Sequence, residues 1–82
     1  MTTQQQVTDI LARQFGVVPD TITANTDVSK DLGADSLDIV ELVMSLERTF
    51  KIVIEEDEYI GRSSVKSIVD LVNSKVGLKP LI

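Results

Sequence analysis

The sequence predicts an all-α fold, a small four-helix bundle with three main helices, one short third helix and a long loop between the first two. Three observations support this class. The chain has 82 residues and no cysteine, so it has room for one core and no disulfide or thiolate metal site to reinforce it. Three segments repeat apolar residues with the period of a helix, and no two segments read as paired strands. We therefore expect a single domain over residues 1–82, in which residues 77–82 form a frayed tail.

The first helix is expected in the segment TQQQVTDILARQFG. Thr3 and Gln6 have the spacing of a capping box, in which two side chains bond the free backbone N–H groups of a helix start. Apolar residues then share one face, namely Val7, Ile10, Leu11 and Phe15. Gly16 is expected to end this helix. The following segment VVPDTITANTDVSKDLGAD is rich in residues that favour turns, and we expect it to form the long loop.

The second helix is expected in SLDIVELVMSLERTF, which contains no glycine or proline. Ser36 is the predicted N-cap, and Asp38 and Glu41 lie near the positive end of the helix dipole. The apolar residues of this segment cover more than one stripe of a helix: Leu37, Ile39, Val40, Leu42, Val43, Met44, Leu46 and Phe50. Two interpretations stay open. The helix is central and buried on most sides, or some of these side chains contact a partner or line a space for an apolar guest.

The last third of the chain predicts a short helix and a long one. KIVI has strand propensity but no second strand to pair with, so we expect KIVIEEDEYIG to form a loop and a short helix that ends at Gly61. In SSVKSIVDLVNSKVG, Ser63 or Ser64 is the expected N-cap of the last helix, which ends before Gly77. Its apolar residues are Val65, Ile68, Val69, Leu71, Val72 and Val76.

The charge of the chain is concentrated in its middle. Residues 20–58 contain eleven acidic and three basic residues, a net charge of −8 in a chain whose total is −5. This charge argues against nucleic acid as a partner and fits a basic protein, although acidic residues also serve simply to hydrate a helix surface. No apolar run reaches the length of a membrane span, and the polar start MTTQQQ lacks the regions of a signal peptide. We expect a cytoplasmic protein.

The segment LGADSLD presents a serine at a helix start, but its surroundings do not predict an enzyme. The chain has no histidine and no cysteine, so Ser36 has no partner for a serine-histidine-acid triad and no thiol nucleophile exists. GADSL also lacks the second glycine of a hydrolase nucleophile elbow. The sequence therefore predicts a protein without catalytic residues of its own.

A calcium loop is a further candidate for the same region. Counted from the first acid, side chains with oxygen fall on ligand-like positions: Asp27, Ser29, Asp31, Asp35 and Asp38. An EF-hand needs glycine where Leu32 stands and a bidentate glutamate where Asp38 stands. We therefore expect no specific metal site, while weak binding of divalent cations by an acidic module stays open.

Residues 30–54, KDLGADSLDIVELVMSLERTFKIVI, resemble the core of an acyl carrier protein, where an Asp-Ser-Leu motif begins the second helix. The similarity extends over nearly the whole chain: a first helix ending in FGV, a long loop, this motif, a short third helix and a last apolar helix. The resemblance implies that Ser36 carries 4'-phosphopantetheine, transferred from coenzyme A by a phosphopantetheinyl transferase (holo-acyl-carrier-protein synthase). A helix N-terminus is suited to the added anion.

The resemblance also implies partners, for a protein expected to be a monomer. Modifying, acyl-transferring and synthase enzymes would dock basic patches on Asp35, Leu37, Asp38, Glu41, Met44 and Glu47. An acyl chain would be sheltered between the second and fourth helices, lined by Val40, Val43, Leu46, Phe50, Ile54, Ile68 and Leu71. These lining residues are also the ones that any helical bundle would place in its core.

Three positions depart from the family pattern and leave the pathway open. Arg48 and Lys51 stand where carriers of fatty-acid synthesis usually have acids, and Glu55 replaces a common proline. The expected cargo is therefore an acyl intermediate of fatty-acid, other lipid or polyketide synthesis. A peptidyl or aminoacyl carrier of the same fold and an unrelated acidic, cation-binding module stay open as alternatives, although Asp35 before the serine favours an acyl carrier.

Overall fold

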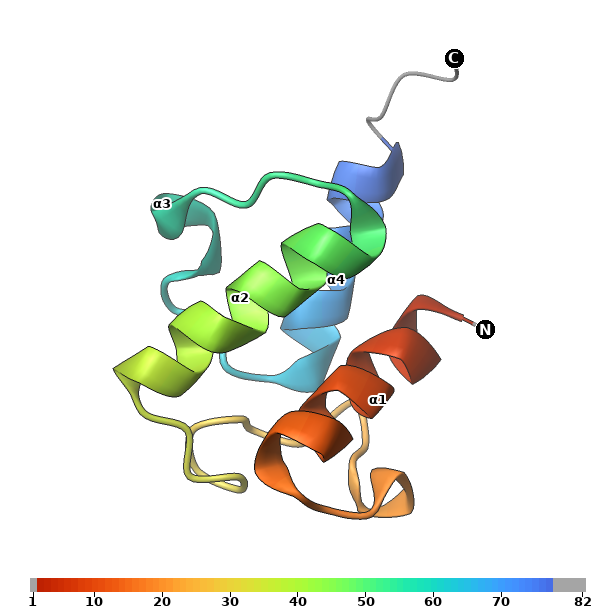
Figure 1. Ribbon diagram of the computed structural model, residues 1–82, viewed down its shortest axis with the longest axis vertical. Helices are drawn as coiled ribbons and strands as arrows, with labels where there is room; N and C mark the ends of the chain where they lie inside the picture. The colour runs from red at the N-terminus through yellow and green to blue at the C-terminus, as the bar shows by residue number, and fades with distance from the viewer. Residues whose placement is uncertain (1, 78–82) are drawn as a thin grey trace.

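Helices account for the regular structure of the chain, as Figure 1 shows for the computed structural model, which describes residues 2–77. The elements in chain order are α1 (Thr3–Phe15), the 3-10 turn η1 (Pro19–Thr21), α2 (Ser36–Phe50), α3 (Glu56–Tyr59) and α4 (Val65–Gly77). Within the described residues no strand forms, and the one extended pairing is an isolated bridge between Asp27 and Ser64. The predicted all-α class, with three main helices and a short third one, is confirmed.

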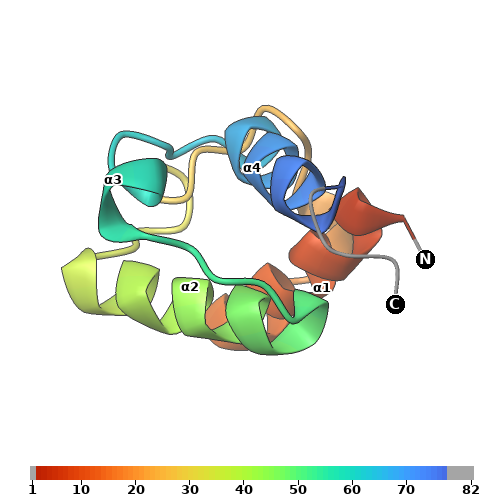
Figure 2. The same cartoon turned by 90° about the horizontal axis from the view of Figure 1, so that it is seen from above.

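The three main helices pack around one core, and α3 lies to one side. α1 packs against both α2 and α4, and the backbone of α3 packs against α4 (Figures 1 and 2). The loop between α1 and α2 is tied to the start of α4, because the Val65 N–H donates to the Thr26 carbonyl at 2.9 Å and the Lys66 N–H to the Ala24 carbonyl at 2.9 Å. The long loop thus closes one end of the bundle and brings residue 36 toward α3.

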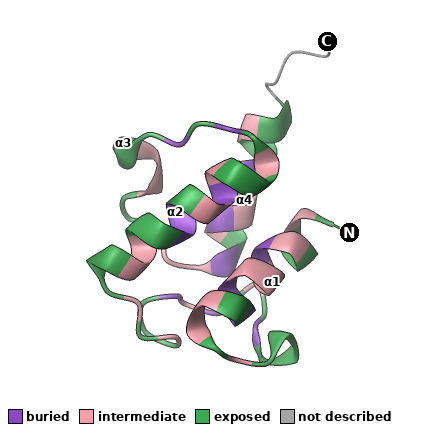
Figure 3. Ribbon diagram, in the orientation of Figure 1, coloured by how far each residue is buried: buried purple, intermediate pink, exposed green. Residues whose placement is uncertain are grey.

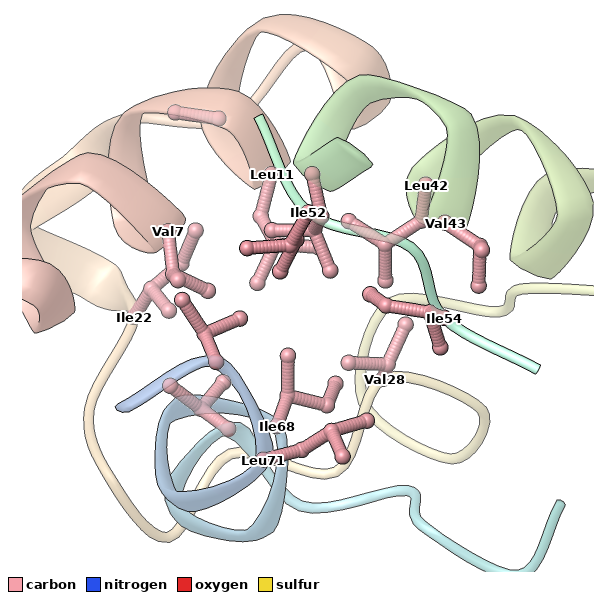
Figure 4. Packing of buried hydrophobic residues seen from close by; sticks show 14 residues of the cluster. Val7, Leu11, Ile22, Val28, Leu42, Val43, Ile52, Ile54, Ile68 and Leu71 are labelled. Carbon is pink, nitrogen blue, oxygen red and sulfur yellow. The ribbon is translucent and has the colours of Figure 1, made fainter. Parts of the chain in front are cut away.

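The core is aliphatic and takes side chains from every main helix, from the long loop and from the segment after α2 (Figure 4). Its buried residues are Val7, Leu11, Ala12, Ile22, Val28, Leu42, Val43, Leu46, Ile52, Ile54, Val65, Ile68, Leu71 and Val72. Full burial of such a leucine or valine side chain contributes about 1.5–3 kcal/mol relative to leaving it in water. Figure 3 shows buried segments on the main helices, in the long loop and in the segment after α2.

The wide apolar surface of α2 is not explained by burial. α2 buries Leu42, Val43 and Leu46, whereas Leu37 is 66% exposed and Met44 is 50% exposed. The interpretation of α2 as a helix buried on most sides is therefore wrong. The exposed apolar residues of α2 are left available for contact with another molecule.

The cap of α1 lies one residue earlier than predicted. The Thr2 hydroxyl accepts the Gln5 N–H at 3.1 Å, and the Gln5 side-chain oxygen accepts the Thr2 N–H at 2.8 Å. The sequence repeats the same Thr-x-x-Gln spacing at positions 2–5 and 3–6, so spacing alone cannot choose between them. Thr3 instead donates its hydroxyl to the Asn73 side chain at 2.6 Å, which joins α1 to α4. Gly16 ends α1 in the left-handed conformation (φ 67°), as expected.

At the start of α4 the structure selects Ser64 over Ser63. The Ser64 hydroxyl accepts the Ser67 N–H at 3.1 Å, which is the geometry of an N-cap. Ser63 donates its hydroxyl to the Asp27 carboxylate at 2.9 Å. Gly77 lies inside α4 as its last residue, where the sequence predicted the start of a frayed tail, and residues 78–82 of that prediction lie outside the described residues.

Asp27 connects the long loop to the start of α4. Its carboxylate accepts the Lys30 N–H at 2.8 Å and the Ser63 hydroxyl at 2.9 Å, while the Val28 N–H donates to the Ser63 carbonyl at 2.7 Å. The Lys30 N–H and, next, the Ser63 hydroxyl stabilise the charged form and lower the pKa of Asp27.

Two basic side chains attach α3 to α4. Lys75 forms an ion pair with Glu58 at 2.6 Å and lowers the pKa of that carboxyl. The Arg62 guanidinium donates from Nε to the Glu58 carbonyl at 2.8 Å and from Nη1 to the Ser67 carbonyl at 2.9 Å. The short helix is thereby held at two points along α4, although it has only one turn.

We expect these contacts to make the fold sensitive to acid. The pKa values of Asp27 and Glu58 are lowered in the folded chain, from ordinary values of 3.8 and 4.5. The two carboxylates therefore stabilise the fold fully when the pH is above these ordinary pKa values. This stabilisation is lost as the pH falls through the ordinary values and then through the lower pKa values of the folded chain. Urea unfolding should show Asp27→Asn and Glu58→Gln to be less stable than wild type near pH 7, with the difference shrinking toward pH 3. Asp57→Asn, which removes an exposed carboxylate of α3, serves as the control. A difference that does not change with pH contradicts the assignment.

Candidate functional site

Ser36 is the first residue of α2, and its hydroxyl is exposed. The predicted N-cap role belongs instead to Asp35, whose carboxylate accepts the Asp38 N–H at 2.9 Å. The Asp38 carboxylate in turn accepts the Asp35 N–H at 3.1 Å, which completes a capping box. Because a carboxylate already caps the helix, the Ser36 hydroxyl makes no hydrogen bond within residues 2–77. The hydroxyl is therefore free to be modified without loss of the cap.

The side chain of Ser36 lies at a groove between α2 and α3. The groove has a volume of about 540 Å³ and is open to solvent. Its lining residues are Ser29, Ser36, Ile39, Val40, Glu56, Tyr59, Ile60, Gly61, Arg62 and Ser63. Val40 and Ile60 line it from opposite elements and remain substantially exposed. A flexible, partly apolar group attached to Ser36 can therefore lie along this groove.

The chemistry available at this site is that of an acceptor. The chain has no histidine or cysteine to activate the Ser36 hydroxyl, and the carboxylates of Asp35 and Asp38 are engaged with backbone N–H groups. The first turn of α2 presents backbone N–H groups and the positive end of a helix dipole, which favour an attached anion. Ser36 can thus hold an esterified phosphate, provided that another protein carries out the transfer.

The residues predicted to dock partners do not all have the same environment. Leu37, Glu41 and Met44 have helical spacing and are exposed on one side of α2, next to Ser36 and Asp35. Asp38 is half-buried and belongs to the capping box. Glu47, the remaining predicted docking residue, lies toward the far end of α2, and its carboxylate binds a backbone N–H of the same chain.

Glu47 stabilises the turn after α2. Its carboxylate accepts the Ile54 N–H at 2.9 Å, and its carbonyl accepts the Ile52 N–H at 3.2 Å. Lys51, which directly follows α2, adopts a left-handed conformation (φ 56°) and ends the helix. No sequence pattern indicates this contact. Glu47 and Ile54 are seven residues apart, and the turn after α2 brings them together.

The residues predicted to line an acyl pocket are divided between three places. A closed cavity of about 20 Å³ lies in the core, and its lining residues are Ile39, Leu42, Val43, Leu46, Ile54, Tyr59, Arg62, Ile68 and Leu71. Five of the seven predicted residues line it, whereas Val40 lines the groove and Phe50 is half-buried against the core. A space of this size accommodates about one water-sized probe. An acyl chain enters only if the helices separate.

Sequence reasoning missed four residues of the cavity wall. Ile39 and Leu42 could have been found, because they share one helical face with Val43 and Leu46. Tyr59 and Arg62 carry no such signal, since their position depends on how the segment between α2 and α4 folds.

The acidic loop does not gather its carboxylates around one point. Among residues 2–77 no group of three or more acidic side chains is placed to hold a metal ion. Asp27 and Asp31 accept backbone N–H groups within the loop, at 2.8 Å in each case. None of the helices within residues 2–77 is long and apolar enough to cross a bilayer.

Comparisons with known proteins agree with this geometry. Residues 5–72 match the family model described as a phosphopantetheine attachment site. The acyl carrier protein of Syntrophobacter fumaroxidans is 46% identical over 67 residues, which cover 82% of this chain and 83% of the relative. That of Campylobacter fetus is 43% identical over 74 residues, which cover 90% and 92% respectively. The solved structure of the Enterococcus faecalis acyl carrier protein superposes with a TM-score of 0.77 at 29% identity, covering 92% of this chain and 99% of that one.

The helical bundle, the exposed serine at the start of α2 and these relatives point to one family. The chain belongs to the acyl carrier proteins, which are non-catalytic carriers of acyl groups on phosphopantetheine.

Proposed function

We propose that Ser36 is the attachment residue and that the protein carries acyl groups between enzymes of fatty-acid, other lipid or polyketide synthesis. The observation that supports this most is the free, exposed hydroxyl of Ser36 at the first residue of α2, beside the groove. When bound, phosphopantetheine supplies a thiol for thioester chemistry, which this cysteine-free chain lacks. A monomeric carrier located in the cytoplasm is part of the same proposal.

The start of α2 is suited to keep the modified serine in place. The helix dipole and free N–H groups favour the negative charge of a phosphodiester. Asp35 and Asp38 keep the first turn formed, so the helix does not need the Ser36 hydroxyl. We propose coenzyme A as the donor and a phosphopantetheinyl transferase as the enzyme that performs the transfer.

We further propose that the docking surface is the exposed side of α2 formed by Asp35, Leu37, Glu41 and Met44. It combines acidic and apolar side chains next to Ser36, so a partner needs a basic patch around an apolar centre. Such charges chiefly increase the rate of encounter, and salt screens their effect.

Attachment at Ser36 can be tested by mass spectrometry. Incubated with a phosphopantetheinyl transferase, magnesium and coenzyme A, the wild-type protein should gain one phosphopantetheine, because the exposed Ser36 hydroxyl at the start of α2 makes no hydrogen bond within residues 2–77 and can accept the group. Ser36→Ala should gain none, while the control Ser45→Ala, which changes a serine inside α2, should be modified like wild type. Modification of Ser36→Ala, or a second group on wild type, would show that another residue is used.

Docking can be tested by reversing one charge. Glu41→Lys should lower kcat/KM of the transferase about 5- to 10-fold at low salt, and the loss should shrink as salt is added. Asp20→Lys makes the same charge change in η1 and should have a much smaller effect. Circular dichroism checks that both variants keep their helices. Equal losses for the two variants would assign the effect to net charge and not to the α2 surface.

The core cavity leads to a prediction of how the length of an attached acyl chain changes the thermal stability of the protein. We propose that an acyl chain on the Ser36 arm folds back and separates α2 from α4, so that each buried methylene adds up to about 0.8 kcal/mol. The melting temperature should then rise from the holo form through short to long acyl forms. Ile68→Trp should fill the cavity and remove this dependence, at an overpacking cost of roughly 1–3 kcal/mol. The control Val76→Trp, at an exposed position of α4, should keep it. Stability that is independent of chain length in wild type rules out the sheltered chain.

A further inference from the structure

The groove beside Ser36 and the closed core cavity have a wall in common. Ile39 of α2, Tyr59 of α3 and Arg62 line both spaces, and we refer to these three residues as the shared wall. A chain that is tethered at Ser36 and lies in the groove reaches the cavity by passing this wall. The inference that follows rests on the proposed function, because it concerns the same acyl chain.

The two sides of α3 are attached differently. On one side, Arg62 and the ion pair between Lys75 and Glu58 connect α3 to α4. On the other side, the backbone of α3 makes no close contact with α2 within residues 2–77. The α2 side chains that line the groove are Ser36, whose hydroxyl makes no hydrogen bond within residues 2–77, and the hydrocarbons of Ile39 and Val40. When α3 moves away from Ile39 and Val40, no hydrogen bond is broken at these two side chains, because they have no polar atoms. The side of α3 that faces α2 is therefore the easier one to open.

Tyr59 supplies the aromatic ring of the shared wall, and its backbone is held by its neighbours. The tyrosine is half-buried and packs against the core cluster. Its carbonyl accepts the Arg62 N–H at 3.0 Å, and the Arg62 guanidinium binds the carbonyls of Glu58 and Ser67. With its charged end bonded to carbonyls, the arginine can present its methylene stem to the cavity. The ring is thus held where groove and cavity meet.

We propose that Tyr59 determines the length of acyl chain that the protein shelters, and that Arg62 keeps the ring in place. Except for Tyr59 and Arg62, every residue of the cavity wall is aliphatic, so the cargo that suits this wall is a hydrocarbon chain without polar groups. The ring limits the space that the separating helices can offer to this chain. Tyr59 is therefore a specificity-determining residue, and Arg62 is a positioning residue.

A chain-length series tests the role of Tyr59. Wild type, Tyr59→Phe and Tyr59→Ala are loaded with amide-linked saturated chains of increasing even length, and each melting temperature is compared with the holo form of the same variant. In wild type the stabilisation should rise and then stop at a limiting length. Tyr59→Phe keeps the ring and should keep this limit, whereas Tyr59→Ala should shift it to a longer member of the series, even though its holo form melts at a lower temperature.

Thioester exposure tests the role of Arg62. Arg62→Met removes the two guanidinium hydrogen bonds and keeps a hydrocarbon stem. Hydroxylamine should cleave its long-chain thioester several-fold faster than that of wild type, while the acetyl forms, which do not reach the cavity, should react equally. Lys66→Met, which removes an exposed cation from the first turn of α4, should behave like wild type.

The outcomes separate this inference from the function on which it rests. If wild type is stabilised by longer chains and Tyr59→Ala has the same limiting length, the role of Tyr59 is overturned and the sheltered chain stands. If Arg62→Met accelerates cleavage of the acetyl and long-chain forms alike, the arginine does not position the ring. Wild-type stability that is independent of chain length removes the sheltered chain, and this inference with it.

Discussion

The reciprocal hydrogen bonds between Asp35 and Asp38 are the contact on which the proposed attachment site depends. They hold the first turn of α2 with two carboxylates and so leave the hydroxyl of Ser36 unbonded and exposed. A serine that capped its own helix would lose that bond on modification, and the helix would lose stability of about 1 kcal/mol. Here the cap and the modified residue are adjacent but separate. The helix start can therefore carry a phosphodiester while its backbone geometry stays the same.

α2 has two apolar sides with different surroundings. Leu42, Val43 and Leu46 face the core, while Leu37 and Met44 remain exposed beside acidic residues. An isolated small domain would gain solubility by making that outer side polar. A carrier that must bind several enzymes through one helix gains a surface that combines apolar contact with charge steering. The same helix thus supports the core, the proposed docking surface and the groove next to Ser36.

The unequal attachment of α3 bears on the proposed shelter of an acyl chain in a tightly packed core. Glu58 and Arg62 tie the short helix to α4, whereas the α2 side of the groove is lined by the unbonded Ser36 hydroxyl and the hydrocarbons of Ile39 and Val40. The core cavity has a volume of about 20 Å³, so the helices would have to separate to admit the proposed acyl chain. Hydrocarbon contacts have no preferred direction, so they would re-form around the proposed acyl chain more readily than hydrogen bonds would.

The sequence by itself determined the all-α class, the approximate bounds of the helices and the family. These features can be read from short stretches of sequence: apolar residues repeat every three or four positions, Gly16 directly follows α1, and the Asp-Ser-Leu motif spans three residues. The tertiary structure decided which of two Thr-Gln pairs caps α1, because Thr3 is taken by Asn73 of α4. It also decided that Glu47 binds the Ile54 N–H, and that Tyr59 and Arg62 separate the groove from the cavity. These contacts join segments that meet only after the chain has folded, so no local pattern contains them.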